Sequence, residues 1–211
     1  MKPAHERGVT APGRQRHAAR LTAAERRQAV IDAALRVFSE GSYAGATTAQ
    51  IAREAGISEP ILYRHFASKK ELYFACLDEA WSGLRNSLQA KMDEVGPVEA
   101  WRELGPSTMR RLKAVVPSLW MQAVTEAGQD PEIRRFVRKH MRDVHDFFAE
   151  ALRRLQEAGG IPADRDPNAE AWVFLGGSLL ASFADRLGGL LSDDDFEAIK
   201  AQRWRWLSGD G

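Results

Sequence analysis

Cysteine and long apolar runs are scarce in this chain. Its 211 residues include one cysteine, Cys76, which excludes an internal disulfide and a cysteine-rich metal site and suits a reducing cytoplasm. Residues 1–20 hold no apolar run, so no secretory signal is expected. The longest apolar stretch, residues 172–184, is short and rich in Gly, Ala and Ser, which argues against a membrane span. We therefore expect a cytoplasmic protein without a membrane partner.

Catalytic signatures are missing as well. The sequence contains no phosphate-binding loop, no dinucleotide fingerprint and no nucleophile elbow. His140 and His145 are five residues apart, so on a helix their side chains diverge and would chelate a metal poorly. We expect no catalytic residue, no cofactor and no metal site, and hence a protein that is not an enzyme.

Charge is nearly balanced overall but unevenly distributed. The formal net charge is +1, yet residues 1–70 carry 12 Lys and Arg against 6 Asp and Glu, whereas residues 71–211 carry 18 against 23. A basic N-terminal third on an acidic remainder suggests that one end of the molecule meets a polyanion. A basic tail without a partner is the alternative, and charge alone does not separate the two.

Alternating strand patterns are also missing, and from Thr22 onward the apolar residues recur with a helical period. The pattern predicts an all-α chain of about nine helices. Capping residues and prolines mark the expected helix starts: Thr22, Thr47, Ser58, Ser68, Pro97, Pro106, Asp130-Pro131, Asp166-Pro167 and Ser192. Pro117 is expected to break or kink the helix that starts near Pro106, because proline has no amide hydrogen. The last helix is expected to bury Phe196, Ile199 and Trp206.

The segment "AGIS", residues 55–58, separates two short helices in the manner of a helix-turn-helix. Gly56 can adopt the left-handed conformation that ends the first helix, Ile57 can fill the corner, and Ser58 can cap the second. On a helical wheel, Ile61, Leu62 and Phe66 face the core, whereas the opposite side carries Glu59, Pro60, Tyr63 and Arg64.

That outward side suits the major groove of DNA. Pro60 offers a rigid apolar surface for a thymine methyl group, Tyr63 can donate its hydroxyl to a phosphate, and Arg64 can reach a phosphate or a guanine edge. The alternative is a small helical hairpin that only docks on the next domain.

The stretch "TTAQIAREAGISEPILYRHFASKKELYFACL", residues 47–77, resembles the DNA-binding domain of the TetR family of transcriptional regulators. The resemblance covers about residues 22–80. The residues that carry it are Thr47-Thr48, Ile51-Ala52, Ala55-Gly56, Leu62-Tyr63, His65-Phe66, Lys69 and Leu72. Beyond this region, only the helical architecture matches.

The polar, basic composition of residues 1–20 and the resemblance together divide the chain into three parts. Residues 1–20 would be a disordered basic arm, residues 21–67 the helix-turn-helix domain, and residues 68–211 a helical ligand-binding and dimerisation domain, with the helix at 68–93 as the connection. The arm, with Arg14, Arg16 and Arg20, either lies along a minor groove or is a solvated tail.

The resemblance also implies roles for individual residues. Thr47 and Thr48 would contact phosphates at the start of the first short helix, and Tyr63, His65 and Lys69 would also contact phosphates. Glu59, Pro60 and Ile61 would face base edges. The full set expected to contact DNA is Thr47, Thr48, Ala49, Ser58, Glu59, Pro60, Ile61, Tyr63, Arg64, His65 and Lys69.

Three of these positions leave alternatives open. Ala49 offers only a methyl group, where some relatives carry a long polar side chain. Glu59 either accepts from a cytosine amino group or is merely tolerated beside the phosphates. His65 lies near the core side of the helical wheel, whereas the resemblance places it on DNA.

The C-terminal half is expected to pair with a second copy and to enclose an effector. Small residues in the helix at 172–187 let another helix approach closely, which favours a homodimer over burial within a monomer. The expected dimer residues are Gly177, Leu180, Ala181, Ala184, Ile199 and Trp206. The candidate pocket residues are Trp101, Met109, Trp120, Met121, His140, Phe147 and Trp172, with Trp81 and Phe148 beside them. Such aromatic and Met residues can equally be plain core, and His140 a satisfied core histidine.

The sequence thus predicts a ligand-responsive transcriptional repressor. Its partners would be a pseudo-palindromic double-stranded DNA operator, a second copy of the chain, and a small, mostly apolar or aromatic effector that releases the DNA. One alternative is a helical ligand carrier or enzyme with a vestigial DNA-binding head. Another is a ligand-independent architectural DNA binder, against which a cavity of roughly a few hundred Å³ in the second domain would argue.

Overall fold

The structure, a computed structural model, describes residues 22–104 and 115–209, without the side chains of residues 115–118, 185 and 186. Within these ranges every regular element is an α-helix, as predicted. The helices are α1 (Ala23–Glu40), α2 (Thr48–Glu54), α3 (Glu59–His65), α4 (Lys69–Val95), α5 (Pro97–Glu103), α7 (Val115–Ala127), α8 (Pro131–Glu157), α9 (Pro167–Arg186) and α10 (Asp193–Ser208). The expected arm at 1–20, the expected helix start near Pro106 and the pocket candidate Met109 lie outside the described residues.

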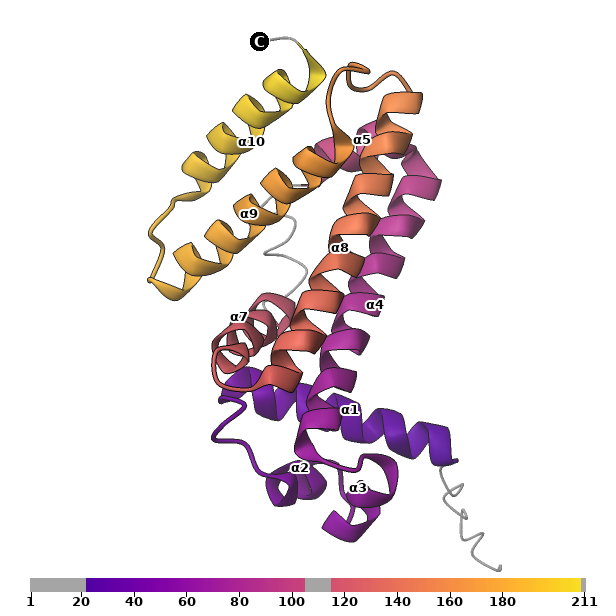
Figure 1. The fold of residues 1–211 in the computed structure, drawn as a ribbon, viewed down its shortest axis with the longest axis vertical. Coiled ribbons are helices and arrows are strands. Elements are labelled where there is room, and N and C mark those ends of the chain that lie inside the picture. Colours follow the sequence, from indigo (N-terminus) through magenta and orange to yellow (C-terminus); the bar gives the residue numbers. More distant parts are fainter. Residues whose placement is uncertain (1–21, 105–114, 210–211) are drawn as a thin grey trace, which may run out of the picture.

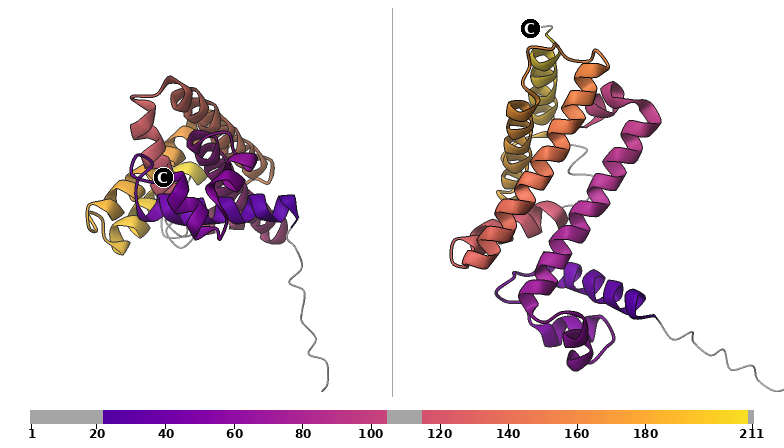
Figure 2. Two further views of the ribbon diagram at one scale, coloured as in Figure 1. Left: turned by 90° about the horizontal axis from the view of Figure 1, so that it is seen from below. Right: turned by 45° about the vertical axis from the view of Figure 1, so that its right-hand side comes forward.

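Helices α1 to α3 form a small head at one end of the molecule (Figure 1). From this head, α4 runs to the far end, and α8 runs beside it in the same direction. At the far end α5 turns back across these two helices, while α7 lies over the head. Figure 2 shows α9 and α10 packed side by side along the α8 flank, away from the head.

Local capping explains where most helices begin. Thr22 and Ser192 form complete capping boxes with Glu25 and Asp195, and Asp130 accepts hydrogen bonds from the backbone amides of Glu132 and Ile133. Pro117 is the third residue of α7 as described, and the residues before Val115, where the expected break or kink would show, lie outside the described residues.

One continuous apolar core runs from Val30 in α1 to Leu207 in α10. Cys76 lies in this core, and burial raises the pKa of its thiol. The last helix differs from expectation, since it buries Phe196 and Leu207, whereas Ile199 and Trp206 are exposed. The boundary at residues 67 and 68 between two domains stays a prediction, because the core extends through both.

Aromatic residues hold the head against α7 and α4. The Tyr73 ring, fully buried, lies 5.0 Å from the Phe38 ring and 4.6 Å from the Tyr43 ring, centroid to centroid. Its hydroxyl donates to the backbone oxygen of Leu119 in α7 at 2.8 Å. A buried tyrosine hydroxyl needs such a partner, so this contact fixes the distance between α4 and α7.

The side chain of Gln122 in α7 adds three hydrogen bonds to the same junction, which we call the Gln122 clasp. Its Oε1 accepts from the amide of Tyr43 at 2.9 Å, and its Nε2 donates to the backbone oxygens of Phe38 at 2.9 Å and Gly41 at 3.4 Å. These three groups belong to the end of α1 and the turn after it. One side chain of α7 therefore satisfies the backbone where the head meets the rest of the molecule.

We expect Gln122→Ala to lower the free energy of unfolding by about 1–3 kcal/mol, because it leaves partly buried backbone groups without partners. Urea denaturation followed by circular dichroism measures the change. The matched control is Gln129→Ala, which removes an exposed glutamine near the end of α7. Equal stability of the two variants would contradict the clasp.

Candidate nucleic-acid interface

The turn between α2 and α3 has the geometry that the sequence predicts. Gly56 adopts a φ of 67°, which glycine tolerates without strain. Its amide donates to the oxygen of Arg53 at 3.1 Å, and the amide of Ile57 donates to the oxygen of Ala52 at 3.0 Å. This pair of bonds is a Schellman motif, which ends α2 and turns the chain sharply into α3.

Helix α3 has one buried and one exposed side. Leu62 is buried, and so is Phe66 directly after the helix. Pro60, Tyr63 and Arg64 are exposed, with 48% of the Tyr63 surface accessible. The helical wheel is therefore confirmed for these five residues. Helix α3 itself lies at the end of the molecule that the head forms (Figure 1).

Thr48 differs most from its expected role. Its side chain is buried at 9% exposure, and its hydroxyl donates to Oε1 of Glu59 and lies 3.1 Å from the hydroxyl of Tyr63. The sequence resemblance placed this hydroxyl on a phosphate, but the structure directs it toward α3. The reason is that Thr48, the first residue of α2, lies against α3, a contact that sequence spacing does not reveal.

The remaining candidates on α2 and α3 fall into two groups. Thr47 and Ala49 are exposed, and Thr47 caps α2 by accepting from the amide of Gln50 at 3.1 Å. Ser58 is exposed at the start of α3 but makes no side-chain capping bond, contrary to expectation. Ile61 and His65 are half-buried, so the structure leaves both between the two sides of the helix.

Lys69 acts as a brace inside the head. Its ammonium donates to the backbone oxygens of Tyr43 at 2.8 Å and Ala46 at 3.0 Å, and it lies 4.5 Å from the centroid of the Tyr43 ring. Two of its three N–H groups are thus used by the turn before α2. The resemblance implied a phosphate contact, which only the third N–H could make.

An ion-pair cluster joins the starts of α4 and α8. The ammonium of Lys70 lies 2.6 Å from a carboxylate oxygen of Asp130 and 2.8 Å from one of Glu132. The hydrogen bond from Lys70 is the main reason that the pKa of the Asp130 carboxyl falls below its ordinary value. This cluster fixes the start of α4 against the start of α8, close to the head.

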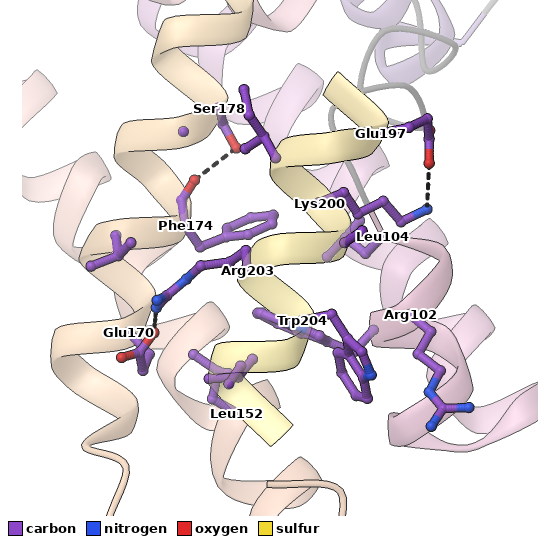
Figure 3. Close-up of a pocket in the computed structure, with 16 residues that line it drawn as sticks. Arg102, Leu104, Leu152, Glu170, Phe174, Ser178, Glu197, Lys200, Arg203 and Trp204 are labelled. Carbon is purple, nitrogen blue, oxygen red and sulfur yellow. Dashed lines mark hydrogen bonds and ion pairs between the residues drawn. The ribbon is translucent and has the colours of Figure 1, made fainter. Parts of the chain in front are cut away.

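The C-terminal part contains a cavity of about 370 Å³ between α5, α8, α9 and α10. Figure 3 shows Phe174 and Ser178 of α9 on one side of it and Lys200, Arg203 and Trp204 of α10 on the other. Trp101, Leu104 and Leu152 complete the apolar wall. The lining is mostly apolar with a few charged groups, which is the usual make-up of a small-molecule site.

Charged side chains at this cavity were not anticipated from the sequence. Glu170 is buried and forms an ion pair with Arg203, which joins α9 to α10. The guanidinium of Arg102 lies 5.0 Å from the centroid of the Trp204 ring. Glu170 and Arg203 are 33 residues apart in a chain with many charges, so no local pattern pointed to this pair.

Of the predicted pocket residues within the described ranges, only Trp101 lines this cavity. Trp120 and His140 pack together in the core with ring centroids 4.7 Å apart, and Nδ1 of His140 lies 3.1 Å from Asp78. Met121, Phe147, Trp81 and Phe148 do not line it either, although the Phe148 ring packs behind Phe174 with centroids 4.6 Å apart. Trp172 is 49% exposed and stacks on His145, because it projects from the opposite side of α9.

The predicted dimer residues lie in three kinds of surroundings: buried within the chain, lining the cavity, and exposed. Ala181 and Ala184 are buried against the chain's own α10, where Phe196 and Leu191 cover them, so a partner helix does not need their small size. Gly177 and Ile199 line the cavity. Leu180 is exposed, and Trp206 is half exposed with the guanidinium groups of Arg165 and Arg203 within 4.4 Å of its ring centroid.

The described residues contain no cluster of His, Cys, Asp or Glu that could hold a metal ion. Within the same ranges, no helix combines the length and the apolar character that a bilayer crossing needs.

We expect Lys69→Met to lower the free energy of unfolding by about 1–3 kcal/mol, since two backbone oxygens lose a charged donor. Chemical denaturation measures this loss, with Lys139→Met, an exposed lysine of α8, as the control. If the Lys69 variant were as stable as the control, its ammonium would not brace the head.

Two family models match the chain. Residues 30–76 match the model of bacterial regulatory proteins of the tetR family, and residues 98–176 match the C-terminal model of BetI-type transcriptional repressors. The first match covers most of the head and the start of α4, and the second runs from α5 into α9.

Individual relatives agree with these matches. The transcriptional activator FasR of Mycolicibacterium smegmatis is 42% identical over 95 residues, which are 43% of each chain. The regulator BetI of Rhizobium meliloti is 29% identical over 133 residues, 62% of this chain and 66% of the relative. The chain thus spans less than two thirds of the length of either relative.

Solved structures share the fold. The regulator FadR of Bacillus subtilis, crystallised with stearoyl-CoA, aligns with a TM-score of 0.66 and 16% identity over 86% of this chain and 97% of that one. The turn geometry, the exposed side of α3, the helical C-terminal part and both family models point the same way: the chain belongs to the TetR family of transcriptional regulators.

Proposed function

We propose that this protein is a ligand-responsive DNA-binding repressor that acts as a homodimer in the cytoplasm. The observation that carries the proposal is the solvent-facing side of α3, with Pro60, Tyr63 and Arg64. A seven-residue helix gains nothing for its own stability by exposing an aromatic ring, so this side is available for another molecule.

The exposed side suits a major groove. Pro60 offers an apolar contact for a thymine methyl group, the Tyr63 ring can pack along the sugars, and Arg64 can reach a phosphate or a guanine edge. Thr47 and Ala49 at the start of α2 lie exposed on the same head, where they can approach the backbone of the DNA.

Two copies of the head are needed to read a pseudo-palindrome with half-sites about 34–36 Å apart, or a multiple of this distance. Exposed apolar side chains on α9 and α10 and the turn between them support such a dimer. They are Trp172, Val173, Leu180, Phe183, Leu187, Leu190 and Ile199. An apolar patch of this kind is typical of a protein interface.

The cavity between α9 and α10 is the proposed effector site. Its volume of about 370 Å³ and its aromatic wall of Trp101, Phe174 and Trp204 favour a small, mostly apolar or aromatic effector. The structural neighbour that holds stearoyl-CoA supports an apolar ligand in this fold. A cavity of this size also argues against a ligand-independent architectural role.

Release of DNA requires that the effector prefer one arrangement of the two heads over the other. Helix α7 is in a position to transmit this preference, because Gln122 contacts the turn after α1 and the Leu119 backbone accepts from Tyr73 of α4. The ion pairs of Lys70 with Asp130 and Glu132 provide a second connection, between α4 and α8.

The first test is binding to the DNA upstream of the gene for this protein, measured by fluorescence anisotropy at several salt concentrations. We expect Tyr63→Ala combined with Arg64→Ala to weaken binding by about 10- to 100-fold, as loss of base and phosphate contacts predicts. Arg138→Ala, an exposed arginine on α8, should bind like the wild type. Unchanged affinity of the double variant would remove α3 from the interface.

The second test concerns the dimer. We expect Leu180→Glu combined with Phe183→Glu to yield monomers in sedimentation experiments, since two carboxylates would be buried in the interface. Val124→Glu, which places the same charge on an exposed apolar residue of α7, is the control. A double variant that sediments like the control would place the dimer contact elsewhere.

A further inference from the structure

The buried hydroxyl of Thr48 joins the two α3 residues that lie one helical turn apart at the proposed DNA surface. It contacts the carboxylate of Glu59 and lies 3.1 Å from the hydroxyl of Tyr63. Glu59 and Tyr63 are four positions apart in the sequence, so they occupy the same side of α3. Thr48 of α2 therefore contacts the side chains of both Glu59 and Tyr63.

Proton counting fixes the direction of the chain of hydrogen bonds. A threonine hydroxyl has one proton, and a carboxylate can only accept, so Thr48 donates its proton to Glu59. In the contact with Tyr63, Thr48 must then accept, and the tyrosine donates its proton. The order is Tyr63 to Thr48 to Glu59.

This order changes what the surface can offer to DNA. Tyr63 uses its proton within the protein, so its hydroxyl presents only lone pairs outward and does not donate to a phosphate. Within the described part of the chain, the second carboxylate oxygen of Glu59 has no hydrogen-bond partner. The Tyr63 hydroxyl and the second Glu59 oxygen can therefore accept hydrogen bonds from a donor group on the DNA, whereas a phosphate offers no proton to either.

Base edges in the major groove supply such donors. Cytosine presents an amino group without an adjacent acceptor on the same base, whereas adenine places its N7 acceptor beside its amino group, where it would face the carboxylate. Glu59 thus favours cytosine. A carboxylate held in one place also discriminates better than a mobile one, because it cannot turn toward a donor elsewhere in the groove.

We propose that Thr48 is a positioning residue for base recognition, and that the Tyr63–Thr48–Glu59 chain makes Glu59 select cytosine at one position of each half-site. This inference rests on the proposed DNA-binding function. Thr48 itself is buried and reads no base; it acts by orienting Glu59 and by taking up the proton of Tyr63.

The experiment is selection of bound sequences from a random DNA library, followed by affinity measurements on single-base operator variants. The wild type should select cytosine at one position and prefer it by about tenfold over the other bases. Glu59→Gln should move the preference at that position toward adenine, which a glutamine amide can contact at both N6 and N7.

Thr48→Val keeps the side-chain shape but removes the hydroxyl, so discrimination at that position should fall about threefold or more while binding to the rest of the site persists. Thr48→Ser should restore the preference, because it returns the hydroxyl. Thr125→Val, an exposed threonine on α7 whose hydroxyl bonds only within its own helix, is the control. Circular dichroism confirms that each variant is folded.

The outcomes separate this inference from the proposed function. If the wild type selects no sequence, the DNA-binding function itself fails. If it selects a sequence and Glu59→Gln keeps the same base preference, Glu59 does not read a base. If Thr48→Val discriminates as well as the wild type, or Thr48→Ser fails to restore discrimination, Thr48 does not position the carboxylate.

Discussion

Burial of Leu62 and Phe66 is the contact on which the head depends. Helix α3 has seven residues, and helices of this length are unstable in isolation, so its structure comes from packing rather than from propensity. Once those two side chains are buried, the other side of the helix must face solvent. The same contact that stabilises α3 therefore decides which residues are presented to a partner. The sharp turn at Gly56 contributes by fixing the angle between α2 and α3, and it is this angle that brings Thr48 under Glu59 and Tyr63.

A second constraint is the junction between the head and α7. Tyr73, Phe38 and Tyr43 form an aromatic cluster, and Gln122 and Lys69 satisfy the backbone of the turn that follows α1. Polar groups of the turn are thus paired where they would otherwise be partly buried and unsatisfied. Because these contacts are numerous and directional, the head is held in a defined orientation relative to α4 and α7. Helix α7 cannot shift relative to the head without breaking these contacts.

The cavity obeys a different constraint. Its walls are mostly apolar, and an isolated charge there would be costly, so Glu170 is paired with Arg203 across the gap between α9 and α10. The pair links the cavity to the two helices that carry the exposed apolar side chains. The shape of the cavity and the arrangement of α9 against α10 therefore depend on the same ion pair.

The local features of this protein could be predicted from its sequence. The helical period, the capping residues and the two sides of α3 depend on neighbours within about one turn, and the pattern around residues 47–77 identified the family. The distribution of Trp and Met did not locate the cavity, because aromatic side chains of core and pocket have the same spacing along a helix. Trp172 and His140 are examples, one stacked on the surface and the other in the core. The Thr48 contact, the Lys69 brace and the Glu170–Arg203 pair join residues on different elements. The sequence by itself determined which segments are helices and which side of α3 is free. Only the tertiary structure decided the partners of Thr48, Lys69 and Glu170, because these contacts follow from the angles at which the helices cross.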